Sequence, residues 1–167
     1  MRGSPISKGY VDELVRRGLR PLAKQRDAAA LDSFYAQIPS RYPRLFEYLF
    51  CFYSWEEVVL GGVELAANLP AADLSGLAAS VRYDRHLWEF LVPRGYLIFG
   101  RMSAGRYDPC AFDMNRRRAS DAPLVRIDHE EVLSFERLGH LSPIASSFKA
   151  FLDEILGTAN GGSRTRG

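Results

Sequence analysis

The sequence predicts an α+β fold in which helices pack against one mainly antiparallel or mixed β-sheet. Two observations support this class. Amphipathic helical patterns open and close the chain, whereas three apolar runs of strand length and a two-glycine hairpin lie between them. These elements do not alternate regularly enough for a doubly wound parallel sheet. The 167 residues, 47% of them hydrophobic and 25% charged, suffice for one domain with a single core.

Three helices are predicted before the first strand. The segment Tyr10–Lys24 places apolar residues at three- and four-residue spacing, but Gly18 and Pro21 weaken its second half, so we expect a helix that ends early. Asp27 is the expected N-cap of a second helix, which Pro39 ends. Pro43 fits the first turn of a third helix that runs to about Tyr53. This third helix is apolar around much of its circumference, so we expect it at the centre of the core.

A hairpin and two further helices follow. Val58–Leu60 and Val63–Leu65 flank the pair Gly61-Gly62, a pattern that predicts two strands joined by a tight turn. Helical spacing then recurs over Leu74–Val81 and over Asp84–Leu91.

The remaining strands lie in the second half of the chain. Tyr96–Phe99 is an uninterrupted apolar run ending at Gly100, and it predicts a central strand. Cys110–Phe112 and Leu124–Ile127 are its expected neighbours, separated by the polar loop Met114–Ala122.

A C-terminal helix is predicted to begin at Ser142-Pro143, a capping residue followed by a first-turn proline. Its apolar stripe consists of Ile144, Phe148, Phe151, Leu152, Ile155 and Leu156. We therefore expect one domain over residues 10–156, with a flexible N-terminus at residues 1–9 and a flexible tail at residues 157–167.

Charge and cysteine usage exclude several classes of partner. A formal net charge of +2 gives no strong field to attract nucleic acid or an anionic membrane. Residues 1–9 lack the apolar stretch of a secretory signal, and the longest apolar run, Leu45–Tyr53, is too short for a membrane span. Cys51 and Cys110 form neither a disulfide framework nor a metal knuckle. We expect a soluble, cytoplasmic protein without a cofactor.

Asp128, His129 and Glu130 form the densest polar group, directly after the strand Leu124–Ile127. The two carboxylates and the imidazole between them could bind a metal ion or act as a general base. Consecutive residues of a strand point to opposite faces, however, so Asp128 and His129 are not expected to converge on one atom. We expect a structural role: Asp128 caps the following turn, and His129 and Glu130 tie the strand end to its neighbours.

Two loops resemble binding motifs only superficially. The loop from Gly100 to Asp108 has no Walker lysine, and its glycines lack the spacing of a nucleotide-binding turn. The run Arg116–Arg118 has no interleaved aromatic residues for base stacking, so a solvated loop is favoured over nucleic-acid binding.

The order of several short motifs resembles the SUKH superfamily. They are Ile38-Pro39, Tyr42-Pro43-Arg44-Leu45, Trp55-Glu56, Gly95-Tyr96-Leu97-Ile98-Phe99-Gly100, Tyr107-Asp108-Pro109-Cys110-Ala111-Phe112-Asp113 and Val125-Arg126-Ile127-Asp128-His129-Glu130. The superfamily takes in fungal Smi/Knr-type cell-wall-assembly regulators and many bacterial proteins thought to be immunity proteins against toxins. The pair Arg106-Tyr107 before Asp108 makes the chain more similar to a bacterial branch in which the domain stands alone.

The resemblance covers roughly Pro39 to Leu156 and implies an α+β domain with no catalytic residues. The family-signature residues, for which it implies a structural role, are Gly100, Asp108, Asp113, Asp128, His129 and Glu130.

We expect a non-enzymatic module, of immunity or regulatory type, that binds another protein, possibly a toxin domain. Aromatic and arginine side chains dominate binding energy at interfaces. The candidate contacts are Trp55, Arg106, Tyr107, Arg116, Arg117 and Arg118. Burial in the core is the alternative for the aromatic residues. The alternative function is a metal-dependent or hydrolytic enzyme; its residues would be Asp113, Asp128, His129 and Glu130. The sequence leaves the oligomeric state open.

Overall fold

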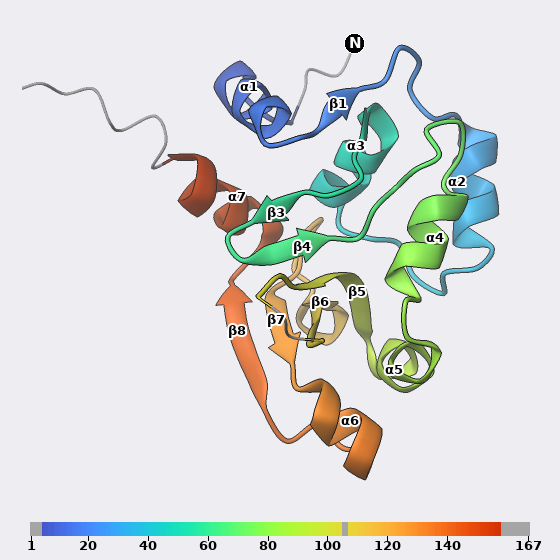
Figure 1. Cartoon of the computed structure of the whole chain (residues 1–167), viewed down its shortest axis with the longest axis vertical. Coiled ribbons are helices and arrows are strands. Elements are labelled where there is room, and N and C mark those ends of the chain that lie inside the picture. The colour runs from blue at the N-terminus through green and yellow to red at the C-terminus, as the bar shows by residue number, and fades with distance from the viewer. Residues whose placement is uncertain (1–4, 105–106, 158–167) are drawn as a thin grey trace, which may run out of the picture.

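The computed structural model describes residues 5–104 and 107–157 and confirms the α+β class (Figure 1). Within these residues, seven α-helices surround a curled sheet whose strands are ordered β3-β4-β5-β6-β7-β8, every neighbouring pair being antiparallel. The strands are β3 (Val59–Leu60), β4 (Val63–Leu65), β5 (Tyr96–Met102), β6 (Pro109–Asp113), β7 (Leu124–Ile127) and β8 (Leu141–Ala145). A separate two-stranded sheet, not predicted, pairs β1 (Arg20–Pro21) with β2 (Tyr53–Ser54).

Three N-terminal helices form as predicted, and the first ends early, as expected: Arg20 and Pro21 of the segment Tyr10–Lys24 lie in β1. They are α1 (Lys8–Arg16), α2 (Ala28–Tyr35) and α3 (Arg44–Phe52). Asp27 caps α2 by accepting a hydrogen bond from the Ala30 amide at 3.0 Å. Helix α1 ends just before Gly18, whose φ of +113° lies in the left-handed region that favours glycine. It begins within residues 1–9, and Ile6 just before it is buried.

The hairpin of β3 and β4 turns at Gly61 and Gly62, which have φ values of +54° and +80°. Glycine adopts such angles without the steric cost that a Cβ brings, which explains why the sequence signal for this turn is clear. Strand β5 lies between β4 and β6, inside the sheet as predicted.

Both faces of the sheet are covered at β5. Leu97 and Phe99 face the main core, which also receives α3, α4 (Ser75–Val81) and α7 (Phe148–Gly157). Tyr96 and Ile98 face a second, smaller core under α5 (Arg85–Leu91) and α6 (His129–Phe135). Burial on both faces explains why β5 appears in the sequence as a continuous apolar run instead of an alternating one.

Phe46 of α3 lies at the centre of the main core, with no exposed surface. Its ring lies within 6.4 Å, centroid to centroid, of six other aromatic rings from α3, β5, β6, α7 and the adjoining loops. They are Tyr42, Phe50, Trp55, Phe99, Phe112 and Phe148. The expectation that the third helix occupies the core's centre is confirmed.

The prediction of a helix beginning at Ser142-Pro143 is wrong. These residues belong to β8, where Pro143 is paired with Val125 of β7, and the helix α7 begins only at Phe148. Strand β8 is an edge of the sheet, where a residue without an N–H group is tolerated.

Among the residues that the structure describes, no helix combines the length and apolar character needed to span a bilayer. Of the predicted tail, residues 157–167, Gly157 is the last residue of α7 and residues 158–167 lie outside the described residues, as do residues 1–4.

Candidate functional site

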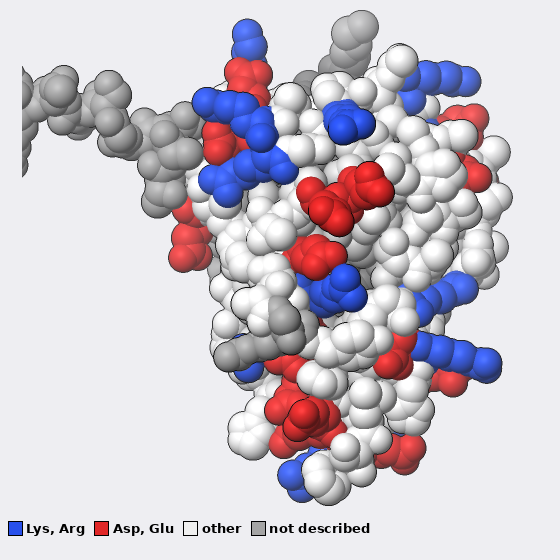
Figure 2. Space-filling view, viewed as in Figure 1, with Lys and Arg blue, Asp and Glu red and all other residues white. Residues whose placement is uncertain are grey.

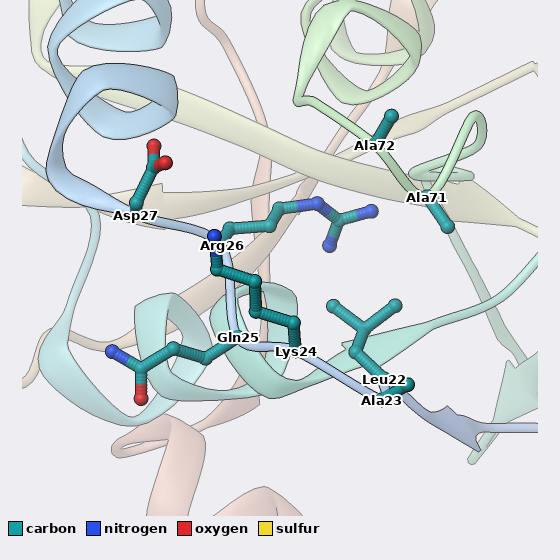
Figure 3. A pocket seen from close by; sticks show the side chains of 8 residues that line it. All are labelled: Leu22, Ala23, Lys24, Gln25, Arg26, Asp27, Ala71 and Ala72. Carbon is teal, nitrogen blue, oxygen red and sulfur yellow. The ribbon is translucent and has the colours of Figure 1, made fainter.

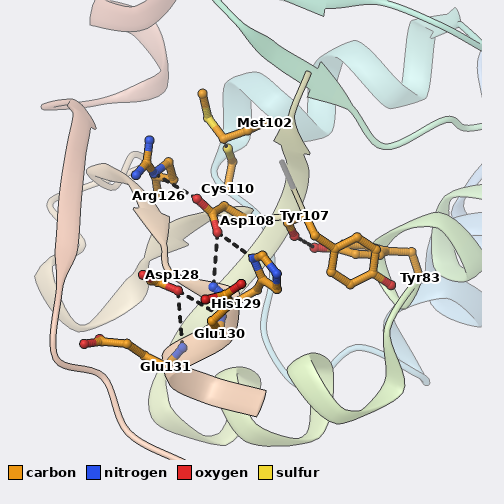
Figure 4. Close-up of polar contacts among 10 residues, drawn as sticks. All are labelled: Tyr83, Met102, Tyr107, Asp108, Cys110, Arg126, Asp128, His129, Glu130 and Glu131. Atoms are coloured by element: carbon orange, nitrogen blue, oxygen red, sulfur yellow. Dashed lines mark hydrogen bonds and ion pairs between the residues drawn. The ribbon is translucent and has the colours of Figure 1, made fainter. Parts of the chain in front are cut away.

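Asp108 lies at the centre of a polar group at one end of the sheet. The register pairs Cys110 of β6 with Arg126 of β7, so Asp108 and Asp128 come opposite one another just beyond the paired residues. Figure 4 shows the Asp108 carboxylate between Arg126 and His129. One oxygen lies 3.2 Å from Arg126 Nε, and the other lies 2.7 Å from His129 Nδ1 and accepts the His129 amide at 3.2 Å.

Asp128 ends the strand by capping a helix that the sequence analysis did not predict. One oxygen of its side chain accepts hydrogen bonds from the amides of Glu130 at 2.9 Å and Glu131 at 3.2 Å, which confirms the expected capping role. His129 is therefore the first residue of α6 and not a strand residue. The expectation that Asp128 and His129 point to opposite faces is wrong for this reason. Ligand atoms of Asp108, Asp128 and His129 all lie within 4.8 Å of one another.

The contacts of Asp108 hold separate elements of the fold together, so we call Asp108, Arg126 and His129 the Asp108 brace. Both oxygens of this buried carboxylate are bonded, and the Arg126 guanidinium supplies the opposite charge. A divalent cation bound by Asp108 would have to share its carboxylate with Arg126 and His129. The brace joins the start of β6 to β7 and to the start of α6.

The four residues of the enzymatic alternative are not assembled. Asp113 is buried at the opposite end of β6, where its side chain accepts the Asn115 amide at 3.2 Å. The side chain of Glu130 is exposed. Only Asp128 and His129 of the predicted set lie together, and their third partner, Asp108, was predicted only as a family-signature residue.

Tyr107 is exposed to 37% and stands beside the brace. Its ring packs in a T-shaped arrangement against His129, at a centroid distance of 5.5 Å, and against Tyr83, at 5.0 Å. The Tyr83 hydroxyl donates to the Tyr107 carbonyl oxygen at 2.9 Å. The Arg101 guanidinium lies 5.6 Å from the Tyr83 ring. Burial, above all, raises the pKa of both tyrosine hydroxyls, so they stay protonated at neutral pH. We call Tyr83, Arg101, Tyr107 and His129 the aromatic surface.

The other predicted contact residues do not join this surface. Trp55 is only 1% exposed, and its indole N–H donates to the Ala66 carbonyl oxygen at 2.9 Å, so the prediction of Trp55 as a surface contact is wrong and its burial in the core is confirmed. Arg106 lies outside the described residues. Arg116, Arg117 and Arg118 are exposed, but they follow β6 at the end opposite to Tyr107.

Arg26 is a buried charge that sequence reasoning missed. It is 4% exposed and lines a pocket of about 330 Å³ with the segment Leu22–Asp27 and with Ala71 and Ala72 (Figure 3). Its guanidinium donates to five backbone carbonyl oxygens; they belong to Phe50, Tyr53, Asn68, Pro70 and Asp73. Because a guanidinium has five N–H donors, none is left for an anion in the pocket. Burial lowers the pKa of Arg26 from its ordinary value.

No protein-family model matches this sequence, and no curated protein matches it. The resemblance to SUKH domains therefore stays a prediction from the order of the motifs.

Proposed function

We propose that this chain is a non-enzymatic, protein-binding module of the SUKH type, acting as an immunity or regulatory protein, and that it docks its partner through the aromatic surface. The observation that supports the proposal most is the placement of Tyr107. This side chain is exposed, yet two neighbouring rings restrain it.

The restraint of the Tyr107 side chain in the free protein favours its affinity for a partner. An exposed side chain that is already ordered loses little conformational freedom when a partner covers it. Tyrosine and arginine are also enriched among residues that dominate interface energies, and the aromatic surface offers both types. The Asp108 brace fixes the His129 ring, against which Tyr107 rests. In this proposal, Asp108, Asp128 and His129 have a structural role and not a catalytic one.

The cytoplasm is the proposed location of the protein. Cys51 and Cys110 are both free and buried thiols. Burial raises the pKa of Cys51 to about 11 and that of Cys110 to about 12, so both stay as unreactive thiols at neutral pH.

Affinity capture from the native host, followed by titration of the purified pair, tests the proposal. The immobilised wild-type chain should retain one protein that the Y107A variant binds about tenfold or more weakly by calorimetry. F135A is the matched control, because Phe135 is an aromatic residue that is 66% exposed on α6 and lies outside the aromatic surface. Binding by Y107A that equals wild type, or the absence of any retained protein, would contradict the proposal.

A second candidate function rests on the convergence of Asp108, Asp128 and His129 within 4.8 Å. These groups could hold a divalent metal ion if Arg126 moved aside, as a metal-dependent enzyme would require. Calorimetric titration with Zn²⁺ and with Mn²⁺ separates the two candidates. The protein-binding proposal predicts no tight binding of either ion. Micromolar binding that D128N abolishes and D113N retains would favour the enzyme instead.

A further inference from the structure

A cavity of about 200 Å³ adjoins the aromatic surface. Tyr83 and Arg101 line it and also belong to the aromatic surface, so the two features are continuous. The other lining residues are Glu56, Glu64, Leu65, Ala66, Ala67, Ser80 and Gly100. Figure 2 shows acidic side chains gathered on the face of the molecule that carries β4, beside a basic one.

Small residues allow the cavity to reach the backbone of the sheet. Gly100 of β5 pairs with Leu65 of β4, and a Cβ at this position would overlap the carbonyl oxygen of Glu64. Ala66 and Ala67 continue the lining beyond β4. The cavity is therefore small, and Leu65, Ala66 and Ala67 make part of its lining apolar. Its volume suits one long side chain better than a larger ligand.

The charges in the cavity do not cancel. Arg101 Nη2 lies 3.1 Å from Glu64 Oε1, so these two side chains neutralise each other. Glu56 is exposed, and no hydrogen bond or ion pair to its carboxylate is present among residues 5–104 and 107–157. Among the described residues, one negative charge that lines the cavity is thus left without a partner.

We infer that this cavity receives a lysine or arginine side chain of the partner protein. Its methylene groups would cover Ala66 and Ala67, and its cationic end would pair with Glu56. A side chain inserted here would lie next to Tyr83, so the same partner segment could also contact Tyr107. This inference rests on the proposed function, because it names the chemistry of the residue that the partner presents beside the aromatic surface.

NMR titration of the ¹⁵N-labelled chain tests the inference without knowledge of the partner. The probes are acetyl-lysine amide and acetyl-arginine amide, each titrated to saturation or to its solubility limit. Acetyl-norleucine amide is the control, because it has the aliphatic chain of lysine without the charge. We expect both cationic probes to shift the amides of Glu56, Ala66, Ala67 and Gly100, and the norleucine probe to shift them much less.

Two carboxylate variants give a matched comparison. E56Q should weaken binding of the cationic probes about threefold to tenfold, whereas E57Q should leave it unchanged, because Glu57 is exposed but does not line this cavity. Equal effects of both variants, or shifts that do not map to the cavity, would overturn the inference.

The proposed function and the cavity assignment can fail separately. A captured partner that depends on Tyr107 but binds E56Q as tightly as wild type would leave the proposed function intact and overturn the cavity assignment. Probe binding that E56Q weakens, in a chain that retains no partner protein, would support the cavity as a cation-binding recess and contradict the proposed function.

Discussion

Arg26 and Asn68, which lie 42 residues apart in the sequence, donate hydrogen bonds to the same acceptor, the carbonyl oxygen of Tyr53. The donor–acceptor distances are 3.1 Å from Arg26 and 2.9 Å from Asn68, and Arg26 also donates to the Asn68 carbonyl oxygen at 2.8 Å. The side-chain oxygen of Asn68 accepts the Trp55 amide at 2.8 Å. Two buried polar residues thus connect the segment before α2, the end of α3 and the loop after β4.

Replacement of Arg26 by Met should lower the free energy of unfolding by about 3 kcal/mol or more, because it leaves several buried carbonyl oxygens without a donor. R26K keeps the charge and part of the hydrogen bonding, so its loss should be smaller. Urea unfolding followed by circular dichroism measures both. A loss below about 1 kcal/mol in R26M would show that these bonds contribute little.

Replacement of Phe46 by Ala should cost about 3 to 5 kcal/mol of stability, because it opens a cavity among the six rings that surround this side chain. F46L fills part of that space and should lose less. The same unfolding experiment compares the two variants, and equal losses would argue against Phe46 as the centre of the core.

Gly100→Ala should lower the free energy of unfolding by about 3 kcal/mol, because the new methyl group overlaps the backbone of β4 and must push the strands apart. Gly157→Ala is the matched control: the nearest atom to a Cβ there is the Tyr10 hydroxyl at 3.7 Å, an ordinary contact. Thermal unfolding of both variants checks this expectation. A stable G100A protein with an unchanged melting temperature would be inconsistent with the β4–β5 approach described above.

Glu131 should make stability depend on acid pH. A hydrogen bond from the His140 side chain, and the amides of Gly139 and His140, hold the pKa of the Glu131 carboxylate below its usual value. A lowered pKa in the folded state means that this stabilisation is complete above the unfolded pKa, near 4.3, and is lost as the pH falls through the folded value. Melting temperatures of wild type and E131Q should therefore converge as the pH falls below about 4. A constant difference between them down to pH 2 would contradict this assignment.

Much of the fold could be predicted because particular residues permit few alternatives. Gly61 and Gly62 mark the hairpin, and Asp27 marks the start of α2, because each supplies a backbone angle or a cap that few other residues supply. The apolar run from Tyr96 to Phe99 identified the central strand, since a strand buried on both faces needs apolar residues at every position.

The features that the sequence could not predict depend mainly on contacts between residues that are distant in the chain. Ser142-Pro143 has the pattern of a helix start, and only the pairing of β8 with β7 excludes that interpretation. Helix α6 has a single buried residue, Val132, so its apolar pattern is too weak to identify. The approach of Asp108 to Asp128 and His129 follows from the register of β6 and β7, which local sequence does not determine.

Pro143 also affects how copies of this protein can meet one another. The sheet has two borders: β3 has only two residues, and β8 carries a residue without an N–H group at the middle of its length. A strand from a second molecule would find no long, regular row of donors and acceptors at either border. The same proline that misleads helix prediction thus makes the β8 border a poor template for pairing with a second copy.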